Sequence, residues 1–239
     1  MTSLVRTRPI TIVRTATSPA ERAAPDAPPA PALDLAEVVR EHLVTLDPVL
    51  RALRDEAEHL RDWGVELAER LCGGARLLAA GNGGSAAEAQ HLTSEFVGRF
   101  AADRPSFSAI SLHAESSAVT AIGNDYGYEQ VFARQVRGHG REGDVLVLLS
   151  TSGASSNLIE AAEAARGIGV TTWALTGPGP NPLSSACDDA ITLPGPSSNV
   201  QEAQLVAVHA LCLVFDAEVE RTGSTGPDRA GLRPAGARP

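Results

Sequence analysis

The sequence predicts an α/β domain with a mostly parallel sheet that is covered by helices on both faces. Short apolar runs, of which residues 144–150 are the clearest, alternate along the chain with segments whose apolar residues recur at helical spacing. Strands that are apolar throughout, rather than alternately polar and apolar, are typical of sheets buried on both faces. Ligands of such folds gather at the carboxyl ends of the strands, so the informative residues are expected there.

The first half of the chain begins with a long helical pattern. Residues 33–71 carry apolar residues at helical spacing and are expected to form one long helix or two, with the pattern set by Leu43, Leu46, Leu50, Leu53 and Leu60. A short buried strand follows at 76–81 and a helix at 85–98. A further strand is expected at 107–112, and helices at 116–122 and 128–137.

The second half continues the alternation. After the strand at 144–150, residues 155–167 are expected to form a helix that ends in glycine, a residue common just after helix ends. Strands are expected at 170–176 and 189–194, and a long helix at 199–222 closes the body. The predicted domain therefore spans residues 33–222.

Both ends of the chain differ in composition from this body. Residues 1–32 are rich in Ala, Pro, Arg and Thr, which predicts a disordered leader, and residues 223–239 are expected to be a flexible tail. The leader contains arginines but no continuous apolar segment, so it is a poor secretory signal and only weakly resembles a transit peptide.

Composition excludes several classes of function. The net charge of −9 gives no support for a nucleic-acid surface, and 4% aromatic residues argue against base-stacking platforms. The sequence has no run of about 18 apolar residues, so it predicts no membrane span. All 20 basic residues are arginine. The absence of lysine excludes Schiff-base aldolases, pyridoxal-phosphate enzymes and a Walker A phosphate loop.

The three cysteines, Cys72, Cys187 and Cys212, are far apart, odd in number and in apolar contexts. They are interpreted as reduced core residues, which fits a cytoplasmic location. Trp63 and Trp173 are also expected in the core. The other histidines, His42, His59, His113 and His139, have no supporting neighbours in the sequence and are expected on the surface or in loops.

Two small, polar loops follow predicted strands and lead into helices. They are Gly81–Ser85 and Ser150–Ser156, and the second contains several hydroxyl residues. Glycine allows the backbone to approach a ligand, and a helix N-terminus favours an anion. One such loop could simply cap its helix. The two together favour a sugar phosphate. The first loop lacks the GxGxxG spacing of dinucleotide-binding proteins.

Four residues are candidate metal ligands. His91 and Glu95 are four apart on a predicted helix and share one face, although such a pair is more often a surface contact. Gln201 and His209 lie about 12 Å apart along the last helix, a long reach for one ion. They contribute together only if their side chains lean towards each other or if one belongs to a neighbouring subunit. Asn124 and Asp125 are expected in a turn, beside Tyr126 and Tyr128.

At this point a family resemblance becomes visible. Residues 81–100, which read GNGGSAAEAQH followed by EFVGRF after three residues, resemble the phosphoheptose isomerase family of the sugar isomerase (SIS) domain superfamily. Three more segments agree in order: NDYGYEQVFAR at 124–134, STSG at 150–153, and Gln201-Glu with His209. The resemblance covers about residues 35–220.

The resemblance implies a three-layer αβα sandwich with a five-stranded parallel sheet, and a homotetramer with active sites shared between subunits. It implies one zinc ion per subunit on His91, Glu95, Gln201 and His209, with another divalent metal as an alternative, and Glu95 and His209 as the acid–base pair. The implied substrate-binding residues are Asn82, Gly83, Gly84, Ser85, Glu95, Arg99, Asn124, Asp125, Ser150, Thr151, Ser152, Ser155 and Gln201.

The implied reaction converts sedoheptulose 7-phosphate to D-glycero-D-manno-heptose 7-phosphate, without nucleic acid or membrane. The sequence departs from the family pattern at residues 198–200, where the usual Asp and Arg are missing, at Gln204 in place of His, and at Glu115 in place of Asp. These departures concern substrate details. Two alternatives stay open: a non-catalytic SIS protein of the type that associates with the replication initiator, and an isomerase of another sugar phosphate in a natural-product pathway.

Overall fold

The computed structural model describes residues 34–223 of the chain. By its internal contacts the chain divides into two units, residues 1–35 and 36–239, and the architecture below is that of the second unit. The predicted leader at 1–32 and most of the predicted tail lie outside the described residues.

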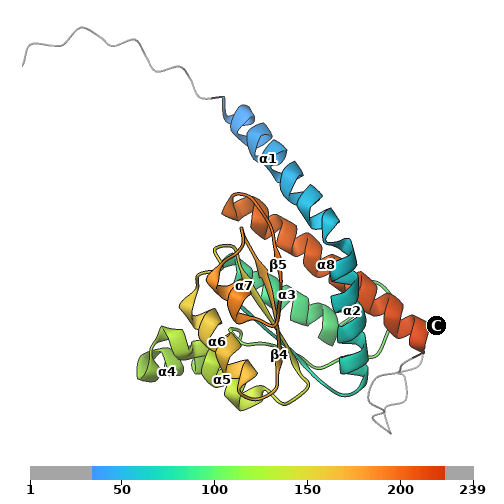
Figure 1. The fold of residues 1–239 in the computed structure, drawn as a ribbon, viewed down its shortest axis with the longest axis vertical. Helices are drawn as coiled ribbons and strands as arrows, with labels where there is room; N and C mark the ends of the chain where they lie inside the picture. The colour runs from blue at the N-terminus through green and yellow to red at the C-terminus, as the bar shows by residue number, and fades with distance from the viewer. Residues whose placement is uncertain (1–33, 224–239) are drawn as a thin grey trace, which may run out of the picture. The chain divides into compact units, whose positions relative to one another are not determined.

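The centre of the fold is a parallel sheet of five strands in the order β2-β1-β3-β4-β5 (Figure 1). The strands are β1 (Leu77–Gly81), β2 (Ala109–Ser111), β3 (Val145–Ser150), β4 (Thr171–Thr176) and β5 (Asp189–Thr192). The chain leaves β1 towards β2 on one side and returns to β3 on the other. In a sheet of this order the ligand crevice opens between the carboxyl ends of β1 and β3.

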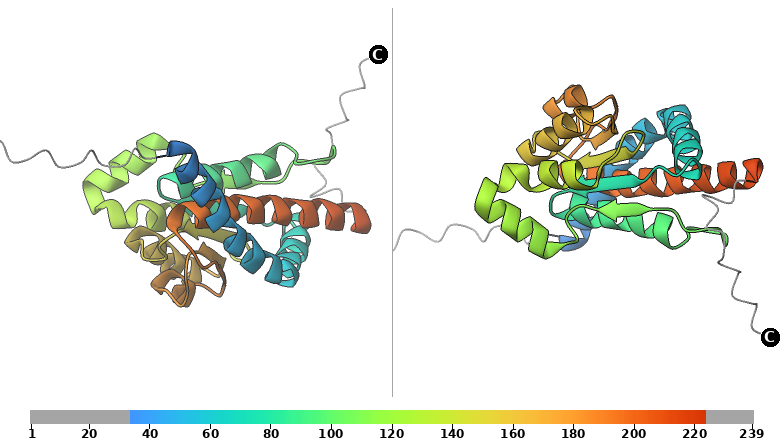
Figure 2. Two further views of the ribbon diagram at one scale, coloured as in Figure 1. Left: turned by 90° about the horizontal axis from the view of Figure 1, so that it is seen from above. Right: turned by 90° about the horizontal axis from the view of Figure 1, so that it is seen from below.

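Helices cover both faces of the sheet. One face packs against α1 (Leu35–Asp55), α2 (Ala57–Cys72), α3 (Gly84–Val97) and α8 (Ser197–Thr222). The other packs against α4 (Ser116–Tyr126), α5 (Val131–His139), α6 (Ser156–Arg166) and α7 (Pro182–Ala186), with the short 3₁₀ helix η1 (Tyr128–Gln130) before α5. Figure 2 shows α8 running alongside α3, with α2 nearby.

The residues of β3 explain why both faces are covered. Val145, Val147 and Leu149 point into the core under α2, α3 and α8. Leu146 and Leu148 point into the opposite core, under α5 and α6. Because successive side chains of a strand alternate in direction, a strand that is apolar throughout needs helices on both sides. The predicted α/β class and parallel sheet are therefore confirmed.

The structure decides between one helix and two at the start of the chain and corrects two further details of the predicted elements. The segment 33–71 forms two helices that meet at Glu56, and the short helix α7 is not apparent in the apolar pattern. Asn124 and Asp125 do not form a turn. They belong to the last turn of α4. The helix ends after Tyr126, because Gly127 has a φ of 89°, which is not a helical value.

The expectation for the two tryptophans is confirmed, and that for two histidines is corrected. The Trp63 and Trp173 rings stack in the core, 4.8 Å between centroids. His59 does have neighbours, since its ring nitrogens lie 3.0 Å from a Glu56 oxygen and 2.7 Å from an Asp189 oxygen. His42 likewise lies 2.8 Å from a Glu202 oxygen. Glu56 is three residues before His59 in the sequence, whereas Asp189 and Glu202 come from distant segments and are brought in by packing.

Helix α8 is the one described helix that is long and apolar enough to cross a membrane by length and composition. Its residues include Val200, Val208, Leu211 and Phe215, which are buried in the core with α2 and α3. The core helix of a compact domain has the same character, and this packing accounts for its composition.

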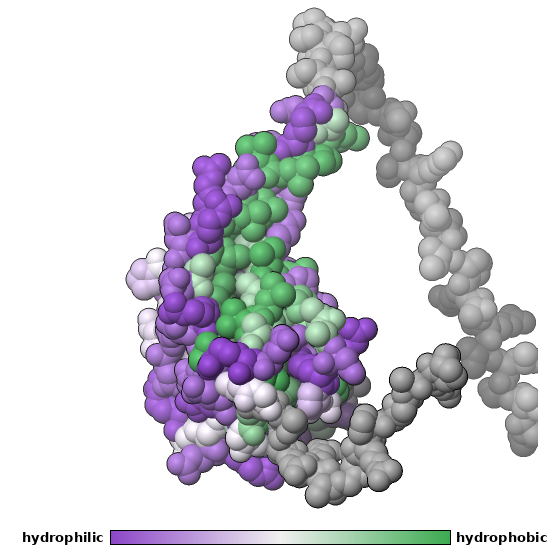
Figure 3. Space-filling model, turned by 90° about the vertical axis from the view of Figure 1, so that its right-hand side faces the viewer, coloured by the Kyte–Doolittle hydropathy of each residue, from purple (hydrophilic) through white to green (hydrophobic). Residues whose placement is uncertain are grey.

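An exposed apolar face lies on α1. Val38, Val39, Leu43 and Val44 are each about half exposed or more, whereas Val49 and Leu53 farther along the same helix are buried. Figure 3 shows a continuous hydrophobic strip on this side of the molecule. Exposed apolar patches of this kind mark contact surfaces more often than isolated apolar residues do.

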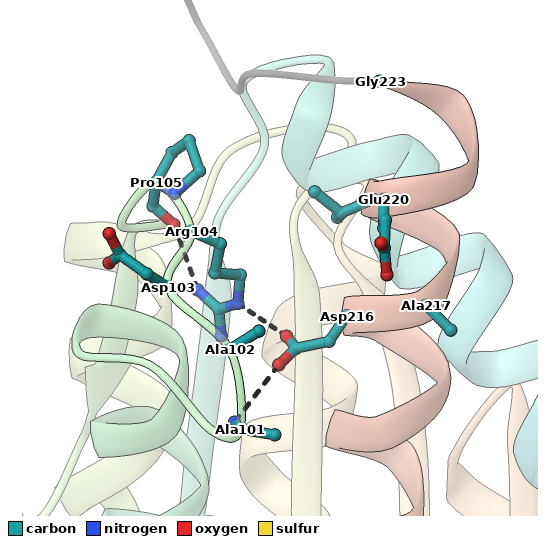
Figure 4. A pocket seen from close by; sticks show the side chains of 10 residues that line it. Ala101, Ala102, Asp103, Arg104, Pro105, Asp216, Ala217, Glu220 and Gly223 are labelled. Carbon is teal, nitrogen blue, oxygen red and sulfur yellow. Dashed lines mark hydrogen bonds and ion pairs between the residues drawn. The ribbon is translucent and has the colours of Figure 1, made fainter.

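Arg104 ties the end of α3 to α8. Its guanidinium donates hydrogen bonds to the backbone carbonyls of Glu95 and Phe96 at the end of α3, at 2.8 and 3.2 Å. It also donates to Asp216 of α8 at 2.6 Å (Figure 4), and both side chains of this pair are largely buried. The Phe96, Phe107 and Phe215 rings surround the guanidinium. A cation at a helix C-terminus is favourable, and this one also fixes two helices.

A cavity of about 490 Å³ lies beside this ion pair, lined by residues 101–105 and by the end of α8 from Asp216 to Gly223. Figure 4 shows Arg104 and Asp216 joined across it. It is separate from the loops at the carboxyl ends of β1 and β3.

Replacing Arg104 by Met should lower the free energy of unfolding by about 3–5 kcal/mol, because Asp216 is left as a buried charge without its partner. Urea denaturation followed by circular dichroism measures the change. Adding Asp216→Asn should recover part of the loss. The control is Arg61→Met, which breaks an exposed pair with Glu58 and should cost less than about 1 kcal/mol. Equal losses at Arg104 and Arg61 would contradict the assignment.

Candidate active site

The loop after β1 begins with Asn82, which is held by side-chain hydrogen bonds. Its amide forms a reciprocal pair with the amide of Asn157, with both N–H···O distances at 2.9 Å. The Tyr128 hydroxyl donates to the same Asn82 oxygen at 3.1 Å. Asn157 is on the first turn of α6, after the β3 loop, and Tyr128 is on η1. Asn82 therefore joins three segments at the carboxyl edge of the sheet.

The loop after β3 gathers hydroxyl groups at the start of α6. The Ser150 hydroxyl lies 3.4 Å from that of Ser152 and 3.5 Å from that of Ser155, and it accepts the Gly153 N–H at 3.1 Å. Ser155 precedes the first residue of α6, and its side chain makes no capping hydrogen bond. The plain capping interpretation of this hydroxyl is therefore wrong. Thr151 is half-buried, and its carbonyl packs against Gly177.

The packing of α3 against α8 brings three of the four candidate metal ligands together. His91 and His209 place their Nε2 atoms 2.8 Å apart, and the same His91 atom lies 3.4 Å from Oε1 of Glu95. A nitrogen–nitrogen hydrogen bond needs one ring to donate and the other to accept. The Phe100 ring lies against His209 at 5.3 Å between centroids. His91 and Glu95 are thus more than a surface pair.

Gln201 lies elsewhere on the same interface. A Cβ atom added at Gly84 would fall 1.9 Å from Nε2 of Gln201, so the absence of a side chain at Gly84 makes room for this amide. Gly84 begins α3, seven residues before His91, or about 10 Å along the helix. Within one chain, Gln201 therefore belongs with the β1 loop, and His209 with His91 and Glu95.

The side chains of His91, Glu95 and His209 are of types that bind divalent metals, although the described residues do not form a complete metal site. Two imidazole nitrogens and one carboxylate oxygen are ligands that zinc accepts. No set of three His, Cys, Asp or Glu side chains between residues 34 and 223 is already arranged as a metal site. The convergence of His91, Glu95 and His209 nevertheless fits the chemistry of such an ion.

The remaining predicted residues occupy different positions. Gly83 precedes α3 with a φ of 56°, and Ser85 is buried on the first turn of that helix. Arg99 is exposed after α3 and donates to the carbonyl of Ala101. Asn124 and Asp125 are exposed at the end of α4 and hydrogen-bond each other at 2.8 Å. The described contacts do not join Arg99 or this pair to the histidines.

Sequence reasoning missed three residues of this region. Asn157 and Glu88 lie inside helical patterns, where they resemble ordinary polar positions, and Tyr128 stands between a predicted turn and the start of a predicted helix. For Asn157 the available signal was its place on the first helical turn after a hydroxyl-rich loop. Glu88 is buried on α3, three residues before His91, and nothing in its neighbours signals this.

Comparison with known proteins agrees with the fold and the loops. The SIS domain family matches residues 44–177, more than half of the chain. The sheet order, the β1 loop and the hydroxyl-rich β3 loop thus define a SIS domain protein.

Similar proteins narrow this class. A phosphoheptose isomerase of Streptomyces coelicolor is 59% identical over 191 residues, covering 80% of this chain and 82% of that protein. One from Desulfovibrio desulfuricans is 45% identical over 68% of this chain and 78% of its own length. The solved phosphoheptose isomerase of Neisseria gonorrhoeae is 38% identical with a TM-score of 0.68, over 77% of this chain and 99% of that one. The chain belongs to the phosphoheptose isomerase family, whose members are isomerases of a sugar phosphate.

Glu88 has an unusual environment beside this site. The residue is buried, and its Oε2 atom has no hydrogen-bond partner within the described part of the chain. Burial raises the pKa of Glu88 to about 7. Its folded state therefore holds a proton at pH values where the unfolded chain has released it.

Glu88 should make the protein less stable as pH rises. Its contribution is fully present below the unfolded pKa of about 4.5 and is lost as pH rises through the folded pKa of about 7. Glu88→Gln keeps the shape but does not titrate. The stability of this variant relative to the wild type, measured by urea denaturation, should therefore increase between pH 5 and pH 8. Glu66→Gln, on the surface of α2, is the control for the same exchange at a surface glutamate. A flat difference for Glu88→Gln would show that Glu88 is ionised throughout.

Proposed function

We propose that this protein is an aldose–ketose isomerase that converts sedoheptulose 7-phosphate to D-glycero-D-manno-heptose 7-phosphate. The observation that carries the proposal is the meeting of Glu95, His91 and His209 in one chain of the phosphoheptose isomerase family. Relatives in that family are named for a phosphorylated heptose. The free thiols of Cys72, Cys187 and Cys212 agree with a cytoplasmic enzyme.

The substrate phosphate would bind at the loop after β3. The hydroxyls of Ser150, Ser152 and Ser155 face one another there, with Thr151 in the same loop and the N-terminus of α6 beneath them. Hydroxyl donors together with the positive end of a helix suit a dianionic phosphate. The sugar chain would then extend across the crevice between β3 and β1, towards Gln201. On the β1 side it would meet Asn82, Gly83, Gly84 and Ser85.

The isomerisation moves a proton between C1 and C2 of the sugar through an enediol. The Glu95 carboxylate is the proposed base that removes this proton and returns it to the neighbouring carbon. His209 is the proposed carrier of the hydroxyl proton, and its Nε2 atom lies 2.8 Å from Nε2 of His91. Arg104 positions Glu95, because it holds the Glu95 and Phe96 carbonyls at the end of α3.

A divalent ion, most simply zinc, is the proposed cofactor. His91, Glu95 and His209 would hold it, with Gln201 as a further ligand after a change of side-chain position or from another subunit. Because a tight ligand cannot also be a free base, the bond from Glu95 to the ion would be weak or intermittent. When bound, such an ion polarises a carbonyl oxygen and stabilises negative charge on it. Arg99, Asn124 and Asp125, which the described contacts leave apart from the histidines, remain proposed substrate contacts.

A homotetramer is the proposed assembly. Its support within the chain is the exposed apolar face of α1 (Figure 3). Leu205, Val206 and Leu213 on α8 are also exposed. The residues that we assign to the site lie on α3 and α8, so a subunit packed on α8 can complete it.

The catalytic role of Glu95 predicts that Glu95→Gln folds normally, still binds the sugar phosphate, and loses about a hundredfold or more of kcat. The assay incubates the purified protein with sedoheptulose 7-phosphate and quantifies the aldose product by chromatography. Glu66→Gln, a surface exchange of the same kind, should retain wild-type turnover.

His91→Ala and chelator treatment separate the metal from the base. Both should reduce bound metal in elemental analysis, with activity falling in parallel. Full activity of metal-free protein would refute the metal assignment, and near-normal turnover of Glu95→Gln would place the base elsewhere. A wild type inactive on sedoheptulose 7-phosphate but active on another ketose phosphate would replace the substrate alone.

The assembly can be tested by sedimentation at micromolar concentration. The wild type should sediment as a tetramer of about four times 24.8 kDa. The double change Leu43→Asp and Val44→Asp should shift it towards smaller species, because burying these carboxylates is costly. Glu41→Asp, on the same helix, is the control. A monomeric wild type would overturn the assembly.

A further inference from the structure

We infer that Tyr128 is a positioning residue for the substrate. Its hydroxyl fixes the Asn82 amide and fastens the corner formed by α4 and η1 to the loop after β1. The inference rests on the proposed function for the ligand that Asn82 receives. The structural link itself is the hydrogen bond from the Tyr128 hydroxyl to Oδ1 of Asn82, at 3.1 Å.

Among residues 34–223, the hydrogen bonds of the Asn82 side chain leave its amide one free donor. Its Oδ1 atom accepts from Nδ2 of Asn157 and from the Tyr128 hydroxyl, which uses both lone pairs. One of its two N–H groups donates to Oδ1 of Asn157. The second N–H is the group that can meet a substrate oxygen. A rotation of the side-chain amide by half a turn would interchange its oxygen and its nitrogen. The hydrogen bonds that hold the Asn82 amide therefore also fix the position of this free N–H.

Asn157 provides a rigid anchor on one side. It is 2% exposed and belongs to the first turn of α6, directly after the hydroxyl-rich loop. The Asn82–Asn157 pair thereby joins the loops after β1 and β3. This pair alone leaves the opposite side of the Asn82 oxygen open, and Tyr128 fills that side.

The corner that carries Tyr128 is anchored by partly buried side chains, among them Val119 and Ile122 of α4, which pack against the core. Neither α4 nor η1 contains a buried residue. Gln130 donates to Glu160 of α6 at 3.0 Å and holds the η1 end of the corner. Gly127, whose added Cβ would lie 2.5 Å from Glu129, sets the turn between α4 and η1. The Tyr128–Asn82 bond then joins this corner, with Asn124 and Asp125, to the candidate substrate loop.

Tyr126 provides a matched comparison two residues away. Both tyrosines are more than half exposed. The Tyr126 ring lies under the Arg134 guanidinium, 3.7 Å from its centroid, so its contact is with α5 and involves the ring rather than the hydroxyl. Removing each hydroxyl in turn keeps both rings and separates the proposed role from the general effect of losing a tyrosine hydroxyl.

The experiment compares Tyr128→Phe with Tyr126→Phe. Tyr128→Phe should raise KM for sedoheptulose 7-phosphate about five- to tenfold and change kcat by less than about twofold, because a donor used equally in ground state and transition state is displaced. Tyr126→Phe should leave both constants unchanged. In an Asn82→Ala background, Tyr128→Phe should have no further effect, since its action passes through Asn82.

Hydrogen–deuterium exchange tests the link without substrate. Peptides covering residues 116–130 should exchange faster in Tyr128→Phe than in the wild type or in Tyr126→Phe. Wild-type exchange and wild-type KM in Tyr128→Phe would overturn the inference, as would an equal effect in the Asn82→Ala background. If the wild type does not act on sedoheptulose 7-phosphate, the proposed function fails, and the exchange result still decides whether Tyr128 holds the corner.

Discussion

The packing of α3 against α8 is the constraint on which the candidate active site depends. Three contacts fix this interface along its length: the Gln201 amide against Gly84, His91 against His209, and the Arg104 guanidinium between the end of α3 and Asp216. Each joins residues more than a hundred positions apart in the sequence. A shift of either helix along the other would therefore separate the imidazoles and move the Glu95 carboxylate.

The glycine at position 84 shows how this interface is built from sequence. A glycine in a helix usually costs stability relative to alanine. Here any side chain would overlap the Gln201 amide, so the first turn of α3 approaches α8 at the cost of helix propensity. At the opposite end, three aromatic rings surround the Arg104 guanidinium, and the side chains of Arg104 and Asp216 are both largely buried. The interface thus has the Gln201 amide against a glycine at one end and a largely buried ion pair at the other.

The fold was predictable because its signals are local. Leu146 and its neighbours in β3 are apolar in an unbroken run, and the helical patterns between such runs impose parallel strands. The loops of the candidate site were predictable for the same reason, since glycine and hydroxyl residues directly follow the strands. Residue spacing alone left His209 in doubt, because its partner is on another helix. The family resemblance named the four ligands, but only the packing separates Gln201 from His209 within one chain.

The parts that could not be predicted are polar groups whose partners come from distant segments. Asn82 and Asn157 are 75 residues apart, and each is unremarkable in its own neighbourhood. The buried amide of Asn157 needs a partner, since an unpaired polar group in a core is costly, and Asn82 provides it. The Asn82–Asn157 pair joins the loops after β1 and β3 into one structural unit. The loop after β3, proposed to bind the phosphate, and the loop after β1, proposed to bind the sugar, would then be held at a fixed separation before any ligand binds. The substrate would not have to supply the energy for ordering them.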